Sequence, residues 1–249
     1  MVLAGCGEPR DRLIVALDVD AGADALRLVD LLDGVASFYK VGYQLFLAEG
    51  MKIVRDLVAR GKRVFLDLKM HDVDETITQA VREIRRHGTH FLTIYGNGAT
   101  ARAAIAGRSG ADLPKILSLT LLSSLDEKDL RDLHILGKGK QFRSLDDYVM
   151  WRAKQAIEAG CDGLIASGSV VSKLRAELGE APIIVTPGIR PTGISSDDHK
   201  RFTTPRQAIE AGADYLVVGR PIRNASAPDE MARAIVREIE QGLAAAQVR

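Results

Sequence analysis

Short runs of apolar residues recur along the chain, and longer stretches with apolar residues at helical spacing separate them. Each run has the length of a buried strand, and the stretches DALRLVDLLDG, QLFLAEGMKIVRDLVARG and DYVMWRAKQAIEAG are typical of amphipathic helices. Glycines that can cap a helix end several helical stretches: Gly34, Gly61, Gly160 and Gly212. We expect strands at Leu13–Asp18, Phe38–Val41, Val64–Leu68, Phe91–Ile94, Ile116–Leu121, Gly163–Ala166, Ile183–Thr186 and Tyr215–Val218.

This alternation of strands and helices predicts an α/β fold, a (β/α)₈ TIM barrel that forms one domain over residues 1–249. A doubly wound sheet is the competing fold. It is disfavoured because the first strand is followed by LDVDAGAD and not by a G-x-G-x-x-G turn. No linker or low-complexity tract divides the chain, and we expect residues 1–11 and 244–249 to be ragged ends.

Composition and charge limit the classes of partner. The formal net charge of +1 argues against a nucleic acid or an acidic membrane held by bulk electrostatics, but a pocket for a small anion needs only a few local cations. The two cysteines, Cys6 and Cys161, are too few and too far apart for a disulfide framework or a zinc site. The chain has no apolar run of about 18 residues, and its first residues lack the features of a signal peptide. We therefore expect a soluble, cytoplasmic protein.

Polar side chains gather where several predicted strands end. Asp18 closes the first strand, Lys40 lies in the second, Asp67 with Lys69 in the third, and Ser123 follows the fifth. In a barrel of parallel strands these ends meet at one rim, where the active sites of such enzymes lie. The sequence therefore predicts a site at this rim.

The largest group of closely spaced charged residues begins in the third strand, in the stretch FLDLKMHDVDET. Alternate side chains of a strand share a face, so Asp67 and Lys69 should point together, with Lys40 and Asp72 adding to the array. An ammonium group held between carboxylates stays protonated and can donate a proton or stabilise a developing anion. A solvated ion pair in a helix-capping turn is the plainer alternative. His71 with Asp67 and Asp72 would be a candidate metal site, but the interleaved lysine opposes a cation, and we expect no metal.

Two further motifs indicate anion binding. VVGRPI ends the last strand in Gly219 and Arg220, and VTPGIRPTG places Arg190 in a stiff loop after the seventh strand. Glycine lets an anion approach the backbone, arginine offers a planar pair of donors, and barrels often bind phosphate at these two loops. An ordinary turn glycine with a surface arginine is the alternative for either motif alone.

LDLKMHD resembles the D-x-K-x-x-D signature of the orotidine 5′-monophosphate decarboxylase family. The similarity continues through LIVALDVD, FYKVGYQLF, LTLLSSLDE, TPGIRP, DDHKRFTTP and VVGRPI, spaced as in the bacterial enzymes, and covers nearly the whole chain. The signature alone is shared across a wider suprafamily. The resemblance implies a homodimeric barrel that converts orotidine 5′-monophosphate to UMP in pyrimidine biosynthesis, with neither a metal nor an organic cofactor.

The resemblance also implies roles for individual residues. Lys69 matches the proton donor to C6 of the pyrimidine, Asp67 lies against the departing carboxylate, and Lys40 connects this array to the ribose hydroxyls. The remaining matches are Asp18 at the ribose, Ser123 at the pyrimidine edge, Arg190, Gly219 and Arg220 at the phosphate, and Asp72 and Thr76 contributed across the dimer interface to the neighbouring site.

His199 stands where many bacterial relatives have a glutamine that joins the phosphate lid to the pyrimidine. An imidazole can donate one hydrogen bond there but lacks the paired donor and acceptor of an amide. A neutral surface histidine is the alternative interpretation.

Two other functions remain open from the sequence. One is a Mg²⁺-dependent decarboxylase or aldolase of the same suprafamily that acts on a sugar phosphate. The other is a barrel that binds phosphorylated metabolites without catalysis.

Overall fold

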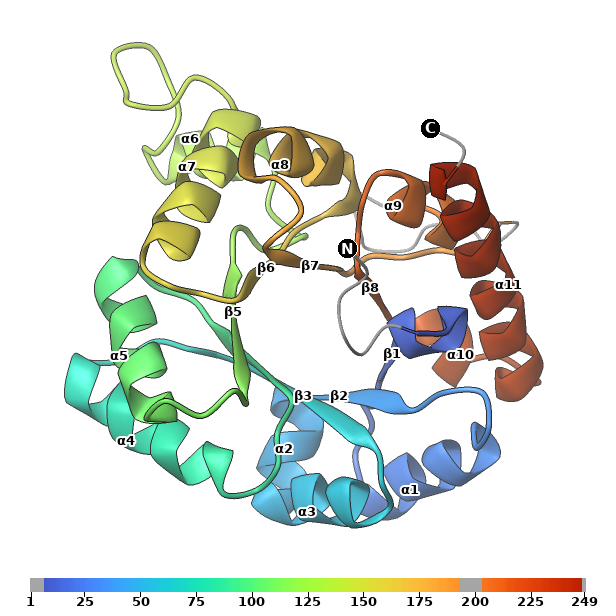
Figure 1. The fold of residues 1–249 in the computed structure, drawn as a ribbon. Helices are drawn as coiled ribbons and strands as arrows, with labels where there is room; N and C mark the ends of the chain where they lie inside the picture. The colour runs from blue at the N-terminus through green and yellow to red at the C-terminus, as the bar shows by residue number, and fades with distance from the viewer. Residues whose placement is uncertain (1–6, 193–202, 248–249) are drawn as a thin grey trace.

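The computed structural model describes residues 7–192 and 203–247 of the chain. Its centre is a closed barrel of parallel strands, in which each strand pairs with the next and β8 pairs with β1 (Figure 1). Closure confirms the predicted TIM barrel and excludes the doubly wound sheet. The strands are β1 (Leu13–Ala16), β2 (Phe38–Gly42), β3 (Arg63–Met70), β4 (Phe91–Ile94), β5 (Lys115–Leu119), β6 (Gly163–Ile165), β7 (Ile183–Thr186) and β8 (Tyr215–Val218).

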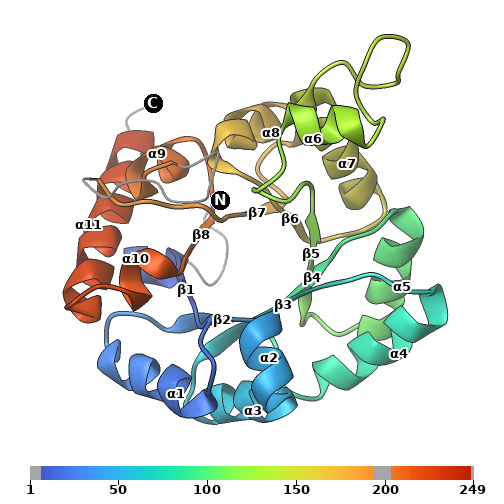
Figure 2. The ribbon, with the colours of Figure 1, turned by 180° about the vertical axis from the view of Figure 1, so that it is seen from behind.

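The helices form a ring around the barrel, and the same ring is seen from the other end in Figure 2. The helical stretch that begins after β2 is broken in two at Gly50, whose φ is 60°. The helices are α1 (Gly22–Leu31), α2 (Tyr43–Glu49), α3 (Met51–Ala59), α4 (Asp74–Arg85), α5 (Gly98–Arg108), α6 (Glu127–Asp132), α7 (Leu145–Glu158), α8 (Val171–Leu178), α9 (Pro205–Glu210), α10 (Arg220–Arg223) and α11 (Pro228–Gln247), with 3₁₀-helices η1 (Pro9–Arg12) and η2 (Gly168–Val170).

Apolar side chains fill the barrel on both faces of the strands. Successive side chains alternate, so that Ile14 points into the barrel while Val15 joins the layer between strands and helices. At the amino-terminal end of the barrel the rings of Phe38, Phe91 and Tyr215 pack together with centroids 5.0 to 5.8 Å apart; Tyr215 meets both phenylalanines edge to face. Because the interior is packed, polar chemistry is confined to the barrel ends.

Regular structure reaches further toward both ends of the chain than we expect from the sequence. Pro9–Arg12 forms the helix η1, although we expect residues 1–11 to be ragged. The Asp11 carboxylate anchors it by accepting hydrogen bonds from Arg63 and Ser37. At the other end α11 continues to Gln247, past residue 244, and α11 packs against α9 and η1. Tertiary contacts that a terminal sequence does not reveal stabilise both segments.

Candidate active site

A cavity of about 240 Å³ opens at the carboxyl-terminal end of the strands. It brings together the predicted residues from β1, β2, β3 and the loops after β5, β7 and β8. The lining residues are Ala16, Asp18, Lys40, Phe65, Asp67, Lys69, Leu119, Leu122, Ser123, Ile165, Pro187, Gly188, Arg190, Val217, Gly219 and Arg220.

Four charged side chains of alternating sign form a connected array along one wall. The Lys40 ammonium lies 2.9 Å from Oδ1 of Asp18 and 3.6 Å from Oδ2 of Asp67. The Lys69 ammonium lies 2.9 Å from Oδ1 of Asp67. Both lysine amines thus converge on one carboxylate, as the spacing of the third strand predicts for Asp67 and Lys69.

Asp67 is the centre of this array, and its side chain is only 14% exposed. Burial by itself would raise the pKa of this carboxyl group, but the ammonium groups of Lys40 and Lys69 oppose burial. Hydrogen bonds from Lys69 and Thr93 act in the same direction, and the net result is a pKa of Asp67 below its ordinary value. The carboxylate is therefore ionised near neutral pH, and its negative charge compensates the positive charges of the neighbouring lysines.

The space around Lys40 depends on Gly42, the last residue of β2. A Cβ at this position would lie 2.7 Å from the Lys40 Nζ and 3.1 Å from Oδ1 of Asp18, closer than ordinary contact. Arg223 supports the same wall, because its guanidinium donates to the backbone carbonyl of Asp18. Gly42 and Arg223 were not predicted as site residues from the sequence. Their closeness along the chain to Lys40 and Arg220 could have indicated that they lie at the site.

The loops after β7 and β8 bring two arginines to the same cavity. Arg190 is 6% exposed, and its Nη1 donates to the Ile189 carbonyl at 2.8 Å. Arg220 begins α10 directly after Gly219, so both arginines lie on the loops after β7 and β8 where we expect an anion. His199, which the resemblance places at the phosphate lid, lies outside the described residues.

Asp72 and Thr76 lie outside this cavity. Both are exposed and line a separate open depression of about 440 Å³ beside Tyr43 and Lys69. The Asp72 carboxylate accepts the backbone N–H of Val73, and in the described part of the chain it forms no ion pair with a lysine or arginine. Asp72 therefore does not join the charge array of Asp18, Lys40, Asp67 and Lys69.

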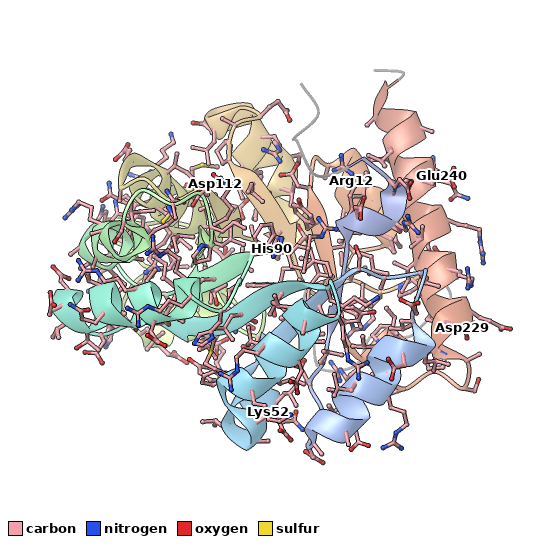
Figure 3. The ribbon with its side chains drawn as sticks, turned by 60° about the horizontal axis from the view of Figure 1, so that its bottom comes forward. Arg12, Lys52, His90, Asp112, Asp229 and Glu240 are labelled. Carbon is pink, nitrogen blue, oxygen red and sulfur yellow. The ribbon has the colours of Figure 1, made fainter. Side chains whose placement is uncertain are left out.

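A larger cavity of about 840 Å³ lies at the opposite, amino-terminal end of the barrel. Figure 3 shows the two ends of the barrel: Arg12 and Asp112 lie toward the amino-terminal end, and Lys52 and Asp229 lie toward the carboxyl-terminal end. The charged groups of the larger cavity pair with one another: Arg63 with Asp11, and Lys115 with Asp112. Size therefore does not identify the site; the smaller cavity is the candidate because it lies at the carboxyl-terminal end of the strands, where the active sites of such barrels lie.

Residues 7–192 and 203–247 contain no cluster of three or more His, Cys, Asp or Glu side chains that could hold a metal ion. The carboxylates of the candidate site are instead separated by lysine amines. None of the helices in these segments is long and apolar enough to cross a membrane.

Comparison with known proteins agrees with this geometry. A sequence profile of the Orotidine 5′-phosphate decarboxylase / HUMPS family matches residues 11–235. The orotidine 5′-phosphate decarboxylase of Afipia carboxidovorans is 48% identical over 232 residues, which are 93% of this chain and 95% of that protein. The protein of the same name from a Methylobacterium species is 44% identical over 236 residues, or 94% and 97% of the two chains.

Solved structures give the same result. The crystal structure of orotidine 5′-phosphate decarboxylase from Lactobacillus acidophilus superposes with a TM-score of 0.78 at 33% identity, covering 91% of this chain and 98% of that chain. Family profile, bacterial relatives and fold thus agree over nearly the full length, and the chain belongs to the orotidine 5′-phosphate decarboxylase / HUMPS family.

Proposed function

We propose that this protein decarboxylates orotidine 5′-monophosphate to UMP without a metal or an organic cofactor, in de novo pyrimidine synthesis. One observation carries the proposal. The Lys69 ammonium is paired with a largely buried carboxylate in a cavity that two arginines also line. We further propose the cytoplasm as its compartment, which agrees with a chain of two cysteines whose Cys161 is a free, buried thiol.

The proposed reaction breaks the bond between C6 of the pyrimidine and its carboxylate. Carbon dioxide leaves, and the electron pair stays on C6 in an orbital orthogonal to the ring π system, where resonance helps little. The Lys69 ammonium stabilises this pair through a fixed positive charge and then donates its proton to C6. Solvent returns a proton to Lys69. Each ~1.4 kcal/mol of such preferential stabilisation is a tenfold gain in rate.

Asp67 holds Lys69 in place and lies where the substrate carboxylate would approach. Because Asp67 is ionised, it would also repel that carboxylate until CO₂ departs. The Lys40 ammonium lies between the carboxylates of Asp67 and Asp18. From there, Lys40 and Asp18 would contact the ribose hydroxyls. Catalysis and sugar binding are therefore parts of one charge array.

The phosphate would bind at Arg190, Arg220 and the backbone of Gly219. Arginine forms paired hydrogen bonds to phosphate oxygens, and the burial of Arg190 strengthens them by excluding water. Ser123 lies in the same cavity, where it can contact the pyrimidine edge. Binding energy from the phosphate can then offset the electrostatic strain at C6. We include His199 in this proposal as a residue of the phosphate lid, a role that rests on the sequence.

We also propose a homodimer in which Asp72 and Thr76 complete the neighbouring site. The depression that they line is flanked by exposed apolar side chains: Tyr43 is 52% exposed, Leu47 81% and Val73 68%. Tyr43 and Leu47 lie one turn apart on α2 and share a face. Exposed apolar clusters of this kind favour a protein interface.

A direct assay tests the proposal. Purified protein is added to orotidine 5′-monophosphate in the presence of EDTA, and conversion to UMP is followed by ultraviolet absorbance. Turnover that persists in EDTA is expected. Turnover that requires added Mg²⁺ would favour the sugar-phosphate alternative, and tight UMP binding without any turnover would favour the non-catalytic barrel.

A further inference from the structure

The carboxyl-terminal half of β3 departs from regular pairing with β4. Leu66 pairs with Leu92, and the next pair is Met70 with Ile94. Residues 67–69 of β3 therefore lie opposite the single residue Thr93 of β4. Extra residues in one strand form a bulge that redirects side chains, and bulges of this kind recur beside active sites.

Lys69 has the strained backbone of this bulge, with a positive φ of 46°. A residue with a side chain keeps such a conformation only where its surroundings impose it. The Lys69 N–H donates to a side chain of β4, the Oγ1 of Thr93, at 2.9 Å. From the opposite side, the Tyr43 hydroxyl donates to the carbonyl of Leu68.

The same threonine hydroxyl also holds the Asp67 carboxylate. Thr93 Oγ1 lies 2.8 Å from Oδ1 of Asp67, the oxygen that also accepts a hydrogen bond from the Lys69 Nζ. A hydroxyl has one proton and two lone pairs, so Thr93 can donate to Asp67 while it accepts from the Lys69 backbone. Thr93 is 0% exposed, so water does not compete for either bond.

On the basis of the proposed function, we infer that Thr93 is a positioning residue for the decarboxylation. Its hydroxyl bonds the Lys69 N–H across the bulge and, through the same oxygen atom, fixes the orientation of Asp67. Thr93 is absent from the lining of the candidate cavity, so it acts through these two residues and does not touch the substrate. Two degrees of freedom, the Lys69 backbone and the Asp67 side chain, are thus coupled through one atom.

The test compares Thr93→Val, which keeps the shape and removes the hydroxyl, with Thr93→Ser, which keeps the hydroxyl. We expect kcat for orotidine 5′-monophosphate to fall about 10- to 100-fold in Thr93→Val with little change in KM, and to stay within a few-fold in Thr93→Ser. The acidic limb of the kcat profile should also move to higher pH in Thr93→Val, because the Thr93 bond lowers the pKa of Asp67. Equal kcat in the wild type and Thr93→Val would overturn the inference.

A matched control is Thr89→Val, at a threonine that is 1% exposed just before the same strand. Its hydroxyl has no hydrogen-bond partner among the described residues. We expect no change in kcat there. A loss equal to that of Thr93→Val would mean that any buried hydroxyl near β4 matters, which would overturn a specific role.

A second readout does not depend on activity. Amide hydrogen exchange at Lys69, followed by NMR on protein labelled with ¹⁵N-lysine, should accelerate in Thr93→Val and stay slow in Thr93→Ser. If the wild type does not decarboxylate the substrate, the proposed function fails, while unchanged Lys69 exchange in Thr93→Val would separately refute the positioning role. Should Thr93→Val not fold, Thr93→Ala and Thr93→Ser make the same comparison, since they differ only in the oxygen.

Discussion

Gly42 is the position where one added carbon should disturb the chemistry and leave the fold intact. Its φ of −102° and ψ of −173° are extended backbone that alanine also adopts. The new Cβ of Gly42→Ala would lie 2.7 Å from the Lys40 Nζ, whereas ordinary contact begins at 3.4 Å. The amine must therefore move by roughly 0.7 Å, the difference between these two distances.

This displacement cannot be absorbed freely, because the Lys40 side chain is 11% exposed and lies between two carboxylates, Asp18 and Asp67. A misplacement approaching 1 Å in a positioned group lowers the rate by about 10- to 100-fold. The stability should change by less than about 1 kcal/mol, because a side-chain tip moves and because replacing glycine also reduces the entropy of the unfolded chain.

Initial rates of orotidine 5′-monophosphate decarboxylation over a range of substrate concentrations give kcat/KM, and urea unfolding of the same preparation gives the stability. Gly98→Ala is the matched control. Its Cβ would meet the Arg102 Nη1 at 3.1 Å, and this exposed side chain can move into solvent. Wild-type kcat/KM in folded Gly42→Ala would refute the claim that the position of the Lys40 amine matters.

Three further predictions concern the charge array. Lys69→Ala should abolish decarboxylation and retain UMP binding, measured by calorimetry; near-normal turnover would contradict the acid role. Mixing inactive Lys69→Ala and Asp72→Ala proteins should restore about a quarter of wild-type activity, because half of the dimers are hybrids with one intact site; no recovery in hybrids verified by native mass spectrometry would contradict the shared site. The folded-state pKa of Asp67 is lowered from 3.8, so its pairing stabilises the fold above that pH and is lost as pH falls. The unfolding free energy of wild type relative to Asp67→Asn should accordingly rise from about pH 2 to about pH 5 and then level off; a difference independent of pH would contradict this.

The strand positions could be predicted because each buried strand is an apolar run bounded by helical periodicity. The structure has all of the predicted strands; β4, β7 and β8 have the predicted bounds, and the other strands differ at one or both ends. β1 stops at Ala16, two residues before the expected end at Asp18, and β3 continues to Met70, beyond Leu68. These ends depend on pairing with a neighbouring strand, which local sequence does not encode.

The clustering of Asp18, Lys40, Asp67 and Lys69 could also be predicted, because residues at the carboxyl ends of parallel strands share a rim. The geometry that joins Asp67 to Lys69 is different from the expected regular strand, since Lys69 has a positive φ. A bulge gives no periodic signal. Thr93 was missed for the same reason, because one threonine within the apolar run FLTI reads as an ordinary strand residue.

The alternating charges explain how the protein can hold this site before any substrate binds. The formal charges of the two lysines and two aspartates sum to zero, so each charge in the array has a compensating neighbour. The substrate carboxylate would add a negative charge beside Asp67 and unbalance the array, and the arginines at the phosphate end can offset that repulsion through binding at a distance. As CO₂ departs, the added negative charge moves from beside Asp67 to C6, where it faces the Lys69 ammonium, so it would be better compensated in the transition state than in the bound substrate. An array built this way would favour the proposed reaction through its resting geometry, so substitutions at Gly42 and Thr93, which fix that geometry, should lower the rate even though every charge remains.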